Sequence, residues 1–209
     1  MRGIFITFEG GEGSGKTTQI KLLEKHFQEK GRKCLVTREP GGSKGGDAIR
    51  QLLLTGAGDK WNPMTETLLF QAARVEHVET LIKPALARGE VVICDRFLDS
   101  TLVYQGIAKG LGVEFVNRLS ELTIGSFVPD LTVLLDIDPQ IGLSRAKNRA
   151  GDETRFENMD ISFHNKVREG FLFLARKDPQ RYAIIDAVQP EKEVHAAVLK
   201  SLVSLAVLN

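Results

Sequence analysis

Residues 4–17 read IFITFEGGEGSGKT, an apolar stretch that runs into a glycine-rich turn ending in Lys16 and Thr17. The turn fits the pattern G-x-x-x-x-G-K-[ST] over residues 10–17, and it lies between a predicted strand and a segment of helical periodicity. Its four glycines let the backbone curl with the N–H groups facing inward, and the N-terminus of the following helix adds partial positive charge there. The stretch therefore predicts an α/β fold with a polyphosphate-binding loop.

Two side chains of this loop suit a nucleoside triphosphate. In such a loop the Lys16 ammonium bridges the outer phosphates and the Thr17 hydroxyl holds Mg²⁺. The alternative is a glycine-rich turn with a surface lysine and no ligand. Four glycines within six residues cost backbone entropy that a simple turn does not need, so we favour binding of a purine triphosphate.

A second acidic side chain is expected at the end of a neighbouring strand, where it holds the metal through water. Asp95 follows the apolar run 91–94 and Asp136 ends another such run, so the pattern leaves both candidates open. Arg96 favours Asp95, because an arginine directly after the acid at the carboxyl end of a strand can hold a second anion near the first. The alternative for Arg96 is a surface ion pair.

The rest of the chain alternates between apolar runs of strand length and longer segments of helical periodicity. This alternation predicts a single α/β domain over residues 1–209, with a five-stranded parallel sheet flanked by helices in three layers. The predicted strands are 4–8, 34–37, 91–94, 131–136 and 182–185. Helices are predicted after Lys16, at about 64–86, after Pro139, at about 160–176 and from 191 to the end. Exposed loops are predicted at 38–46, 55–63 and 147–157.

The composition excludes several classes of protein. The 209 residues carry 28 Lys and Arg against 27 Asp and Glu, and a formal charge of +1 argues against nucleic acid as a partner. No apolar stretch approaches the ~20 residues of a membrane span, and Cys34 and Cys94 lie in apolar runs without metal-like spacing. We therefore expect a cytoplasmic protein with reduced thiols, no nucleic-acid partner and no membrane partner.

The predicted helix at 64–86 contains a candidate acceptor site. Its apolar stripe centres near Leu68 and Val75, whereas Phe70 and Arg74 fall opposite the stripe and beside each other. An aromatic ring next to a guanidinium suits a flat heterocycle, which stacks on the ring and accepts a hydrogen bond from the arginine. The alternative is that Phe70 packs against another helix.

A basic segment at about 145–157 is a candidate lid over the phosphates. Arg145 and Arg149 are four residues apart on one helix face, and Arg155 follows in a loop-like stretch. A kinase needs such cations and a closing segment to stabilise the transferred group and to exclude water. A solvated basic helix end is the alternative.

Other proteins with a phosphate loop fit the sequence less well. GTP switches carry a base-reading motif resembling N-K-x-D after a later strand, where this chain has DIDP at 136–139, and partition ATPases usually begin the loop with lysine rather than Gly10. We therefore expect a kinase. The alternatives are a kinase for another nucleoside monophosphate and a nucleotide-gated binding module that hydrolyses slowly.

Five motifs together resemble the bacterial type of the thymidylate kinase family along nearly the whole chain. They are FEGGEGSGKTTQ at 8–19, TREPGG at 37–42, LLFQAAR at 68–74, DRFLDSTLVYQG at 95–106 and RAKNRAGDETRFE at 145–157. The resemblance implies a P-loop NTPase fold, transfer of the γ-phosphoryl group of ATP to dTMP to give dTDP, Mg²⁺ as cofactor, and a homodimer. The SKGG segment at 43–46 is richer in glycine than is usual in the family.

The resemblance also implies roles for individual residues. Glu12 would reach the acceptor 3′-hydroxyl, Arg50 and Arg96 would clamp the dTMP phosphate, and Tyr104 would exclude a ribose 2′-hydroxyl. The implied dTMP-binding residues are Glu12, Glu39, Arg50, Phe70, Arg74, Arg96, Thr101, Tyr104 and Gln105, of which Phe70 would stack on thymine and Arg74 would bond its O4. The implied ATP-binding residues are Gly10, Gly11, Glu12, Gly13, Ser14, Gly15, Lys16, Thr17, Thr18 and Arg145. The implied catalytic residues are Lys16, Arg96, Arg149 and Arg155, and the implied metal ligands are Thr17 and Asp95.

Overall fold

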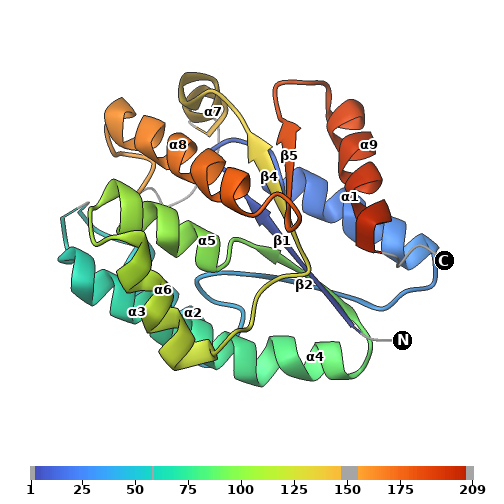
Figure 1. Ribbon diagram of the computed structural model, residues 1–209, viewed down its shortest axis with the longest axis horizontal. Helices are drawn as coiled ribbons and strands as arrows, with labels where there is room; N and C mark the ends of the chain where they lie inside the picture. Colours follow the sequence, from blue (N-terminus) through green and yellow to red (C-terminus); the bar gives the residue numbers. More distant parts are fainter. Residues whose placement is uncertain (1–2, 58, 147–154, 206–209) are drawn as a thin grey trace.

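Five parallel strands form one sheet in the order β2-β3-β1-β4-β5 (Figure 1). The computed structural model describes residues 3–57, 59–146 and 155–205, and the account below concerns these residues. The strands are β1 (Ile4–Glu9), β2 (Cys34–Arg38), β3 (Val91–Asp95), β4 (Leu131–Asp136) and β5 (Tyr182–Asp186). Each strand begins where the sequence predicts and ends within one residue of the prediction, so the predicted sheet is confirmed.

Helices cover both faces of this sheet, which confirms the predicted three layers. On one face, α1 (Lys16–Glu29) and α9 (Glu191–Ser201) pack against the strands, with Leu23 and Val198 in one apolar cluster with Ile6 of β1. The opposite face of β1 places Phe5 in a second cluster, which holds helical residues such as Ile82. The remaining elements are α2 (Lys44–Leu54), α3 (Pro63–His77), the π-helical turn η1 (Val78–Ile82), α4 (Lys83–Ala87), α5 (Leu98–Thr101), the π-helical segment η2 (Leu102–Ala108), α6 (Val113–Ile124), α7 (Pro139–Ala146), α8 (Ile161–Lys177) and the short η3 (Leu202–Leu205).

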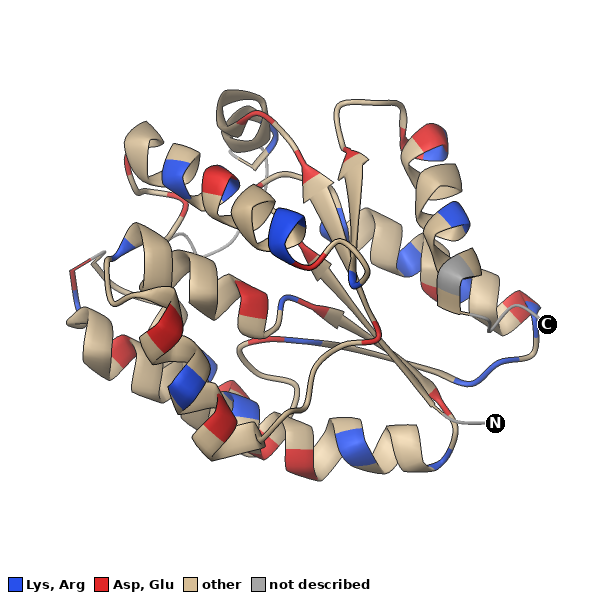
Figure 2. Cartoon of the chain, in the orientation of Figure 1, with Lys and Arg blue, Asp and Glu red and all other residues tan. Residues whose placement is uncertain are grey.

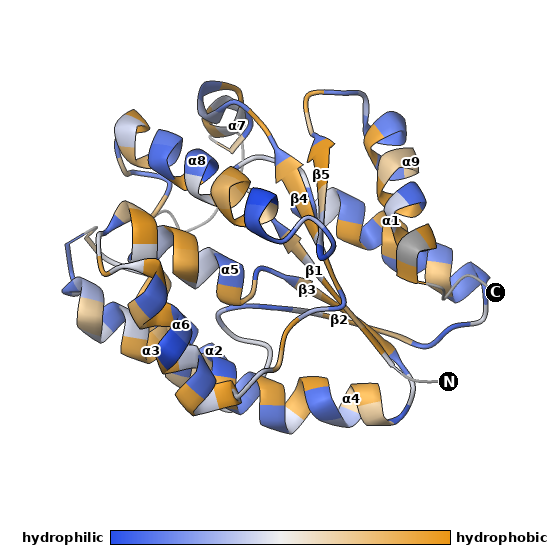
Figure 3. Ribbon diagram, in the orientation of Figure 1, coloured by the Kyte–Doolittle hydropathy of each residue, from blue (hydrophilic) through white to orange (hydrophobic). Residues whose placement is uncertain are grey.

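The strands form the apolar centre of the molecule, as the hydropathy colouring shows (Figure 3). Val92 and Ile93 of β3 point to opposite faces and are both fully buried, because helices cover each side of the sheet. This two-sided burial explains why the central strands β1, β3 and β4 appear in the sequence as continuous apolar runs rather than as alternating ones.

The strand order brings the functional loops together. β2, β3 and β1 are neighbours and run parallel, so the loops that follow them leave the same edge of the sheet. β3, β4 and β5 each end in an aspartate, at Asp95, Asp136 and Asp186. Acidic residues are red in Figure 2, where red segments lie at the ends of these strands. In open α/β sheets, ligands bind at this carboxyl edge where the direction of winding reverses.

One prediction about the helical region is wrong. Residues 64–86 are helical as expected, through α3, η1 and α4, but Leu68 of the predicted core stripe is 49% exposed. Arg74, predicted to lie opposite the core, is 1% exposed. The inner side of α3 faces a polar site, so most of its buried side chains are polar: Gln71 accepts from Arg74 within the helix, and Glu66 accepts from Gln105 of η2.

The predicted loop at 38–46 also ends earlier than expected. α2 begins at Lys44, because the Ser43 hydroxyl caps it by accepting a hydrogen bond from the Gly46 N–H at 3.1 Å. Residues 147–154 of the predicted lid, with Arg149, lie outside the described residues. Within the part of the chain that the structure describes, no helix is long and apolar enough to cross a membrane.

Candidate active site

A cavity of about 330 Å³ lies at the carboxyl ends of β1, β2 and β3. Its wall contains residues from all five motifs quoted above, and the fifth motif contributes its last two residues, Phe156 and Glu157. The nine predicted acceptor residues all line it: Glu12, Glu39, Arg50, Phe70, Arg74, Arg96, Thr101, Tyr104 and Gln105. Both predicted metal ligands, Thr17 and Asp95, line it as well.

The glycine-rich loop forms one side of the cavity with residues 12–17, whereas Gly10, Gly11 and Thr18 do not contribute to the wall. Gly13 has φ +67°, and a Cβ there would lie 1.9 Å from the carbonyl oxygen of Gly142 in α7, so no larger residue fits. The Lys16 ammonium donates to the carbonyl oxygens of Gly10 at 3.2 Å and Gly11 at 3.0 Å. Burial lowers the Lys16 pKa, and the nearby Arg96 cation lowers it further.

The structure distinguishes the two acidic candidates for the metal. Asp95 lines the cavity, and its Oδ1 is buried without a hydrogen-bond partner among the described residues. Asp136 instead makes a two-pronged ion pair with Arg168 of α8, at 2.7 and 2.9 Å. A buried carboxylate oxygen with an unused lone pair, in the same cavity wall as Thr17, fits a hard cation such as Mg²⁺.

Arg96 occupies the centre of a polar cluster around the loop. Its Nη2 donates to Glu12 Oε1 at 2.8 Å, and its Nη1 donates to the Gly10 carbonyl and to Ser100 Oγ, each at 3.1 Å. The guanidinium lies over the Tyr104 ring, 5.2 Å from its centroid, and the Tyr104 hydroxyl donates to Glu12. Burial alone would raise the Glu12 pKa, but the Arg96 and Lys16 cations lower it below its ordinary value. The site thus keeps Glu12 ionised.

Arg96 also has an unusual backbone conformation. Its φ is +65°, a region that residues other than glycine rarely adopt. Glu9, the last residue of β1, holds the turn that follows: its carboxylate accepts from the N–H groups of Phe97 at 2.8 Å and Ser100 at 3.2 Å, and from the Ser100 hydroxyl at 2.7 Å. The sequence analysis assigned no role to Glu9. Its position directly before the glycine-rich loop is the only local signal, and its partners lie about 90 residues further along the chain.

Burial raises the Glu9 pKa from about 4.5 to about 7, and the neighbouring Asp99 carboxylate adds to the shift. Between these two pH values the unfolded chain loses the Glu9 proton while the folded chain keeps it, so this group stabilises the fold less as the pH rises. Glu9→Gln keeps an oxygen acceptor but cannot ionise. We expect the difference in free energy of unfolding, variant minus wild type, to be at least about 1 kcal/mol more positive at pH 8 than at pH 5.

Urea unfolding at the two pH values measures this difference, and Glu29→Gln, an exposed change on α1, is the control. If the free energy of unfolding differs between Glu9→Gln and wild type by the same amount at both pH values, Glu9 does not titrate in this range.

The base-reading candidates form another part of the cavity wall. Phe70 lines the wall with Phe156, their ring centroids 6.4 Å apart. Arg74 donates through Nε to Glu39 at 2.8 Å and through Nη2 to Thr101 at 2.8 Å. Gln105 donates to Glu66, a fully buried carboxylate that the sequence analysis did not select.

The SKGG segment has a structural explanation. Ser43 caps α2, and α2 carries Arg50, whose Nη1 donates to the carbonyl oxygen of Pro40 at 2.7 Å. The two glycines fall in the first turn of the helix, where the cap compensates for their low helix propensity. Arg50 is thereby directed to the cavity wall.

The predicted lid arginines do not line the cavity in the described part of the chain. Arg145 donates to the carbonyl oxygen of Ala187, beyond β5, at 3.0 Å. Arg155 is buried and pairs with Glu66 at 2.5 Å, and it also bonds two backbone oxygens at and beyond the end of α2. In this structure Arg155 thus contacts α3 through Glu66, and α2 and the segment after it through the two backbone oxygens. The wall residues that the sequence analysis did not select are Arg38, Pro40, Leu54, Phe97, Ser100, Phe156 and Glu157.

Comparisons with known proteins agree with the five motifs and with their meeting in one cavity. The family model for thymidylate kinase matches residues 8–198. The chain belongs to the thymidylate kinase family. It is 54% identical over 197 residues to a thymidylate kinase of Rhodopseudomonas palustris (strain TIE-1), covering 93% of this chain and 86% of the relative. It is 50% identical over 202 residues to a thymidylate kinase of Magnetococcus marinus, covering 97% and 96%.

A solved structure supports the same family. The crystal structure of thymidylate kinase from Ehrlichia chaffeensis matches with a TM-score of 0.80 and 34% identity, covering 97% of this chain and all of that chain. The matched family segment, 8–198, begins within β1 and includes every described residue of the cavity wall. The resemblance in the five motifs is thus confirmed as family membership, and the predicted fold is confirmed with it.

Proposed function

We propose that this protein transfers the γ-phosphoryl group of ATP to dTMP with the help of Mg²⁺, giving ADP and dTDP, a precursor for DNA synthesis. The observation that carries the proposal is the convergence of nine acceptor-type side chains and a phosphate loop on one cavity, in a chain of the thymidylate kinase family. Phosphoryl transfer requires positioning and neutralisation of charge rather than a covalent intermediate, and the cavity offers cations on both sides.

The acceptor half of the cavity suits a deoxynucleoside monophosphate. Arg96 and Arg50 supply guanidinium groups for the phosphate, and Glu12 supplies a carboxylate for the 3′-hydroxyl. Phe70 offers a ring face for thymine, and Arg74 offers donors for its O4. Thr101 and Gln105 would face the base near N3, and the Tyr104 ring would occupy the space that a ribose 2′-hydroxyl needs.

The donor half uses the loop at 10–17. Lys16 would bind the outer phosphates of ATP, with Thr17 and Asp95 holding Mg²⁺. The magnesium ion would neutralise charge that develops on the transferred group. Mg²⁺ usually keeps several waters and takes only one or two protein ligands, so a hydroxyl and one carboxylate with a free oxygen are sufficient. For Arg149 and Arg155 we retain a role in catalysis through the lid, and for Arg145 a role in binding ATP.

The proposal is tested by measuring ADP release with dTMP, dUMP, dCMP and AMP as acceptors and with no acceptor. We expect turnover to require an acceptor and to be fastest with dTMP. Turnover that does not depend on the acceptor would contradict a kinase and favour a nucleotide-gated binding module, and a preference for another monophosphate would change the substrate.

We also propose that the protein is a homodimer that works in the cytoplasm. The helix α3 packs against both α2 and α6, and all three helices carry large apolar side chains that are exposed. These are Leu52, Met64, Leu68, Phe115 and Leu122, each at least 38% exposed. Adjoining apolar groups of this kind mark protein interfaces, and a second copy is the partner expected in this family. Cys34 and Cys94 are both free thiols, which suits a reducing compartment.

A charge in this surface should separate the subunits. Leu68→Glu is expected to shift the protein from dimer to monomer in sedimentation velocity, because an unpaired carboxylate would be desolvated in the interface. Val188→Glu is the matched control, since Val188 is 48% exposed against 49% for Leu68 but lies beyond β5. A monomeric wild type, or a dimer that survives Leu68→Glu, would refute an interface on this surface.

A further inference from the structure

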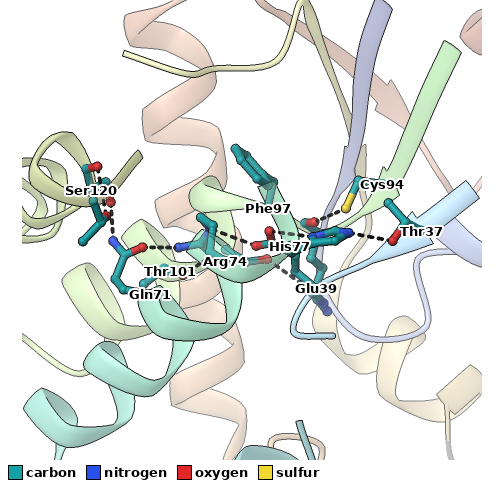
Figure 4. Close-up of polar contacts among 12 residues, drawn as sticks. Thr37, Glu39, Gln71, Arg74, His77, Cys94, Phe97, Thr101 and Ser120 are labelled. Atoms are coloured by element: carbon teal, nitrogen blue, oxygen red, sulfur yellow. Dashed lines mark hydrogen bonds and ion pairs between the residues drawn. The ribbon is translucent and has the colours of Figure 1, made fainter. Parts of the chain in front are cut away.

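A fully buried histidine, His77, ends α3 between two polar residues of the TREPGG segment (Figure 4). Its Nδ1 lies 3.1 Å from Glu39 Oε1, and its Nε2 lies 2.7 Å from Thr37 Oγ1. A carboxylate only accepts hydrogen bonds, so we assign a proton to Nδ1, and Nε2 shares the second hydrogen bond with the Thr37 hydroxyl. Both ring nitrogens are therefore used, although His77 does not line the cavity.

Glu39 links this histidine to the cavity. Its second carboxylate oxygen, Oε2, accepts from the Nε–H of Arg74 at 2.8 Å, so the carboxylate lies between His77 and Arg74 (Figure 4). Without His77 the carboxylate would keep one side-chain partner among the described residues, and it could rotate about its terminal torsion, which is soft. The orientation of Glu39 is therefore set from both sides.

Arg74 is held on several sides as well. Besides Glu39 it donates to Gln71 Oε1 at 2.9 Å and to Thr101 Oγ1 at 2.8 Å, and its guanidinium lies 5.3 Å from the centroid of the Phe97 ring. These three hydrogen bonds use Nε and one hydrogen on each terminal nitrogen, so one N–H on each terminal nitrogen is left for a ligand. A planar group with few free donors recognises a base only if its plane is well oriented.

The packing around His77 leaves no spare space. Gly42 has φ +82°, and a Cβ at this position would lie 2.5 Å from His77 Nε2 and 2.4 Å from Thr37 Oγ1. The TREPGG segment therefore contributes Thr37 and Glu39 as hydrogen-bond partners of the ring. Gly42, which has no side chain, leaves the space that the ring occupies. This shared contact explains why a histidine 35 residues further along meets three positions of one short motif.

We propose that His77 is a positioning residue for recognition of the acceptor base: it orients Glu39, which orients Arg74. The inference rests on the proposed role of Arg74 in reading thymine. Thymine presents the O4 acceptor where cytosine presents an amino donor, so a well-oriented Arg74 favours dTMP over dCMP. Loss of the His77 contacts loosens this discrimination and leaves the phosphate loop untouched.

The test compares kcat/KM for dTMP with kcat/KM for dCMP. His77→Phe keeps a ring of similar size but removes both hydrogen bonds, and it should lower the dTMP/dCMP ratio about tenfold, mainly through a higher KM for dTMP. His77→Asn places an amide donor near the position of Nδ1 and should restore most of the ratio. His195→Phe is the control, because His195 lies on α9 at the other face of the sheet and should leave the ratio unchanged.

Repeating the test in an Arg74→Lys variant separates this inference from the proposed function. Arg74→Lys keeps a cation beside Glu39 but loses the guanidinium fork, so it should lower the ratio, and His77→Phe should add nothing further in that background. A ratio that falls in Arg74→Lys but not in His77→Phe overturns the role of His77 alone. A ratio that His77→Phe lowers equally in both backgrounds also overturns it, and a ratio unchanged in Arg74→Lys overturns the base-reading role of Arg74 itself.

Folding of His77→Phe is checked by its thermal transition. If this variant does not fold, Thr37→Val takes its place, since it removes only the hydroxyl that bonds Nε2 and preserves the side-chain shape. It should lower the dTMP/dCMP ratio about threefold. A wild-type ratio in folded Thr37→Val would then overturn the proposal, because a ring that needs no anchoring on this side is not positioning Glu39.

Discussion

Replacing Lys16 with alanine should lower kcat by about a thousandfold or more, because it removes a positive charge from the place where negative charge develops on the transferred phosphoryl group. In the structure the ammonium lies within the loop, against the carbonyl oxygens of Gly10 and Gly11 and 3.4 Å from Ser14 Oγ. The burial that lowers its pKa also makes its charge effective, since little water screens it. The loop N–H groups remain in the variant, so binding of ATP should weaken less than kcat falls.

The measurement is single-turnover and steady-state transfer at saturating dTMP. Lys25→Ala is the control, because Lys25 lies on the same helix, α1, with its side chain 73% exposed and paired only with Glu29 among the contacts of the described chain. It should change kcat less than twofold. A Lys16→Ala enzyme that keeps kcat within tenfold of wild type would contradict the assigned role of the loop.

Replacing Arg96 with alanine should lower kcat/KM for dTMP by about a thousandfold, the second large effect that we expect. Its guanidinium reaches the loop through Gly10, the acceptor side through Glu12 and the turn of α5 through Ser100. Arg96 is thus placed to contact the dTMP phosphate and the transferred group at once. Its loss also leaves Glu12 without its nearest cation, which adds repulsion toward any anionic substrate.

A lysine at position 96 distinguishes the effect of the positive charge from the effect of the guanidinium geometry. Arg96→Lys keeps the charge but not the planar fork, so it should recover only part of the activity. Arg88→Ala is the control, because Arg88 is 57% exposed and pairs with Glu90 outside the cavity. If Arg96→Ala raised KM for ATP and left kcat/KM for dTMP within tenfold of wild type, its assignment to the acceptor phosphate would be wrong.

Much of the fold could be predicted because its signals are local. The run from Ile4 into the glycine-rich loop combines a strand, a turn and a helix start within a short segment, and the five strands are apolar on both faces. Phe70 and Arg74 were proposed as acceptor residues from the helical pattern, and the resemblance to a family added the other acceptor residues. Their meeting in one cavity follows from strand order, which brings the ends of β1, β2 and β3 to one edge.

Periodicity failed where burial and polarity did not coincide. The apolar stripe of α3 suggested that Leu68 faces the core, but the helix buries Glu66 and Arg74 against a polar site and exposes Leu68. A hydrophobic pattern identifies the inner face only when the neighbour is also apolar. Here the inner neighbours are Thr101, Gln105 and Arg155, which are 27 to 89 residues further along the chain.

The amino-acid sequence by itself determined the parallel α/β architecture, the phosphate loop and the chemical types needed for an acceptor, because the patterns that indicate them are local in the chain. Only the tertiary structure distinguished the two acidic strand ends, since Asp136 pairs with Arg168 from α8 whereas one oxygen of Asp95 has no hydrogen-bond partner among the described residues. It also decided that Glu9 supports the turn of Arg96 and that His77 supports Glu39. Such support comes from side chains that are distant in sequence, and their meeting is set by the packing of helices on the sheet.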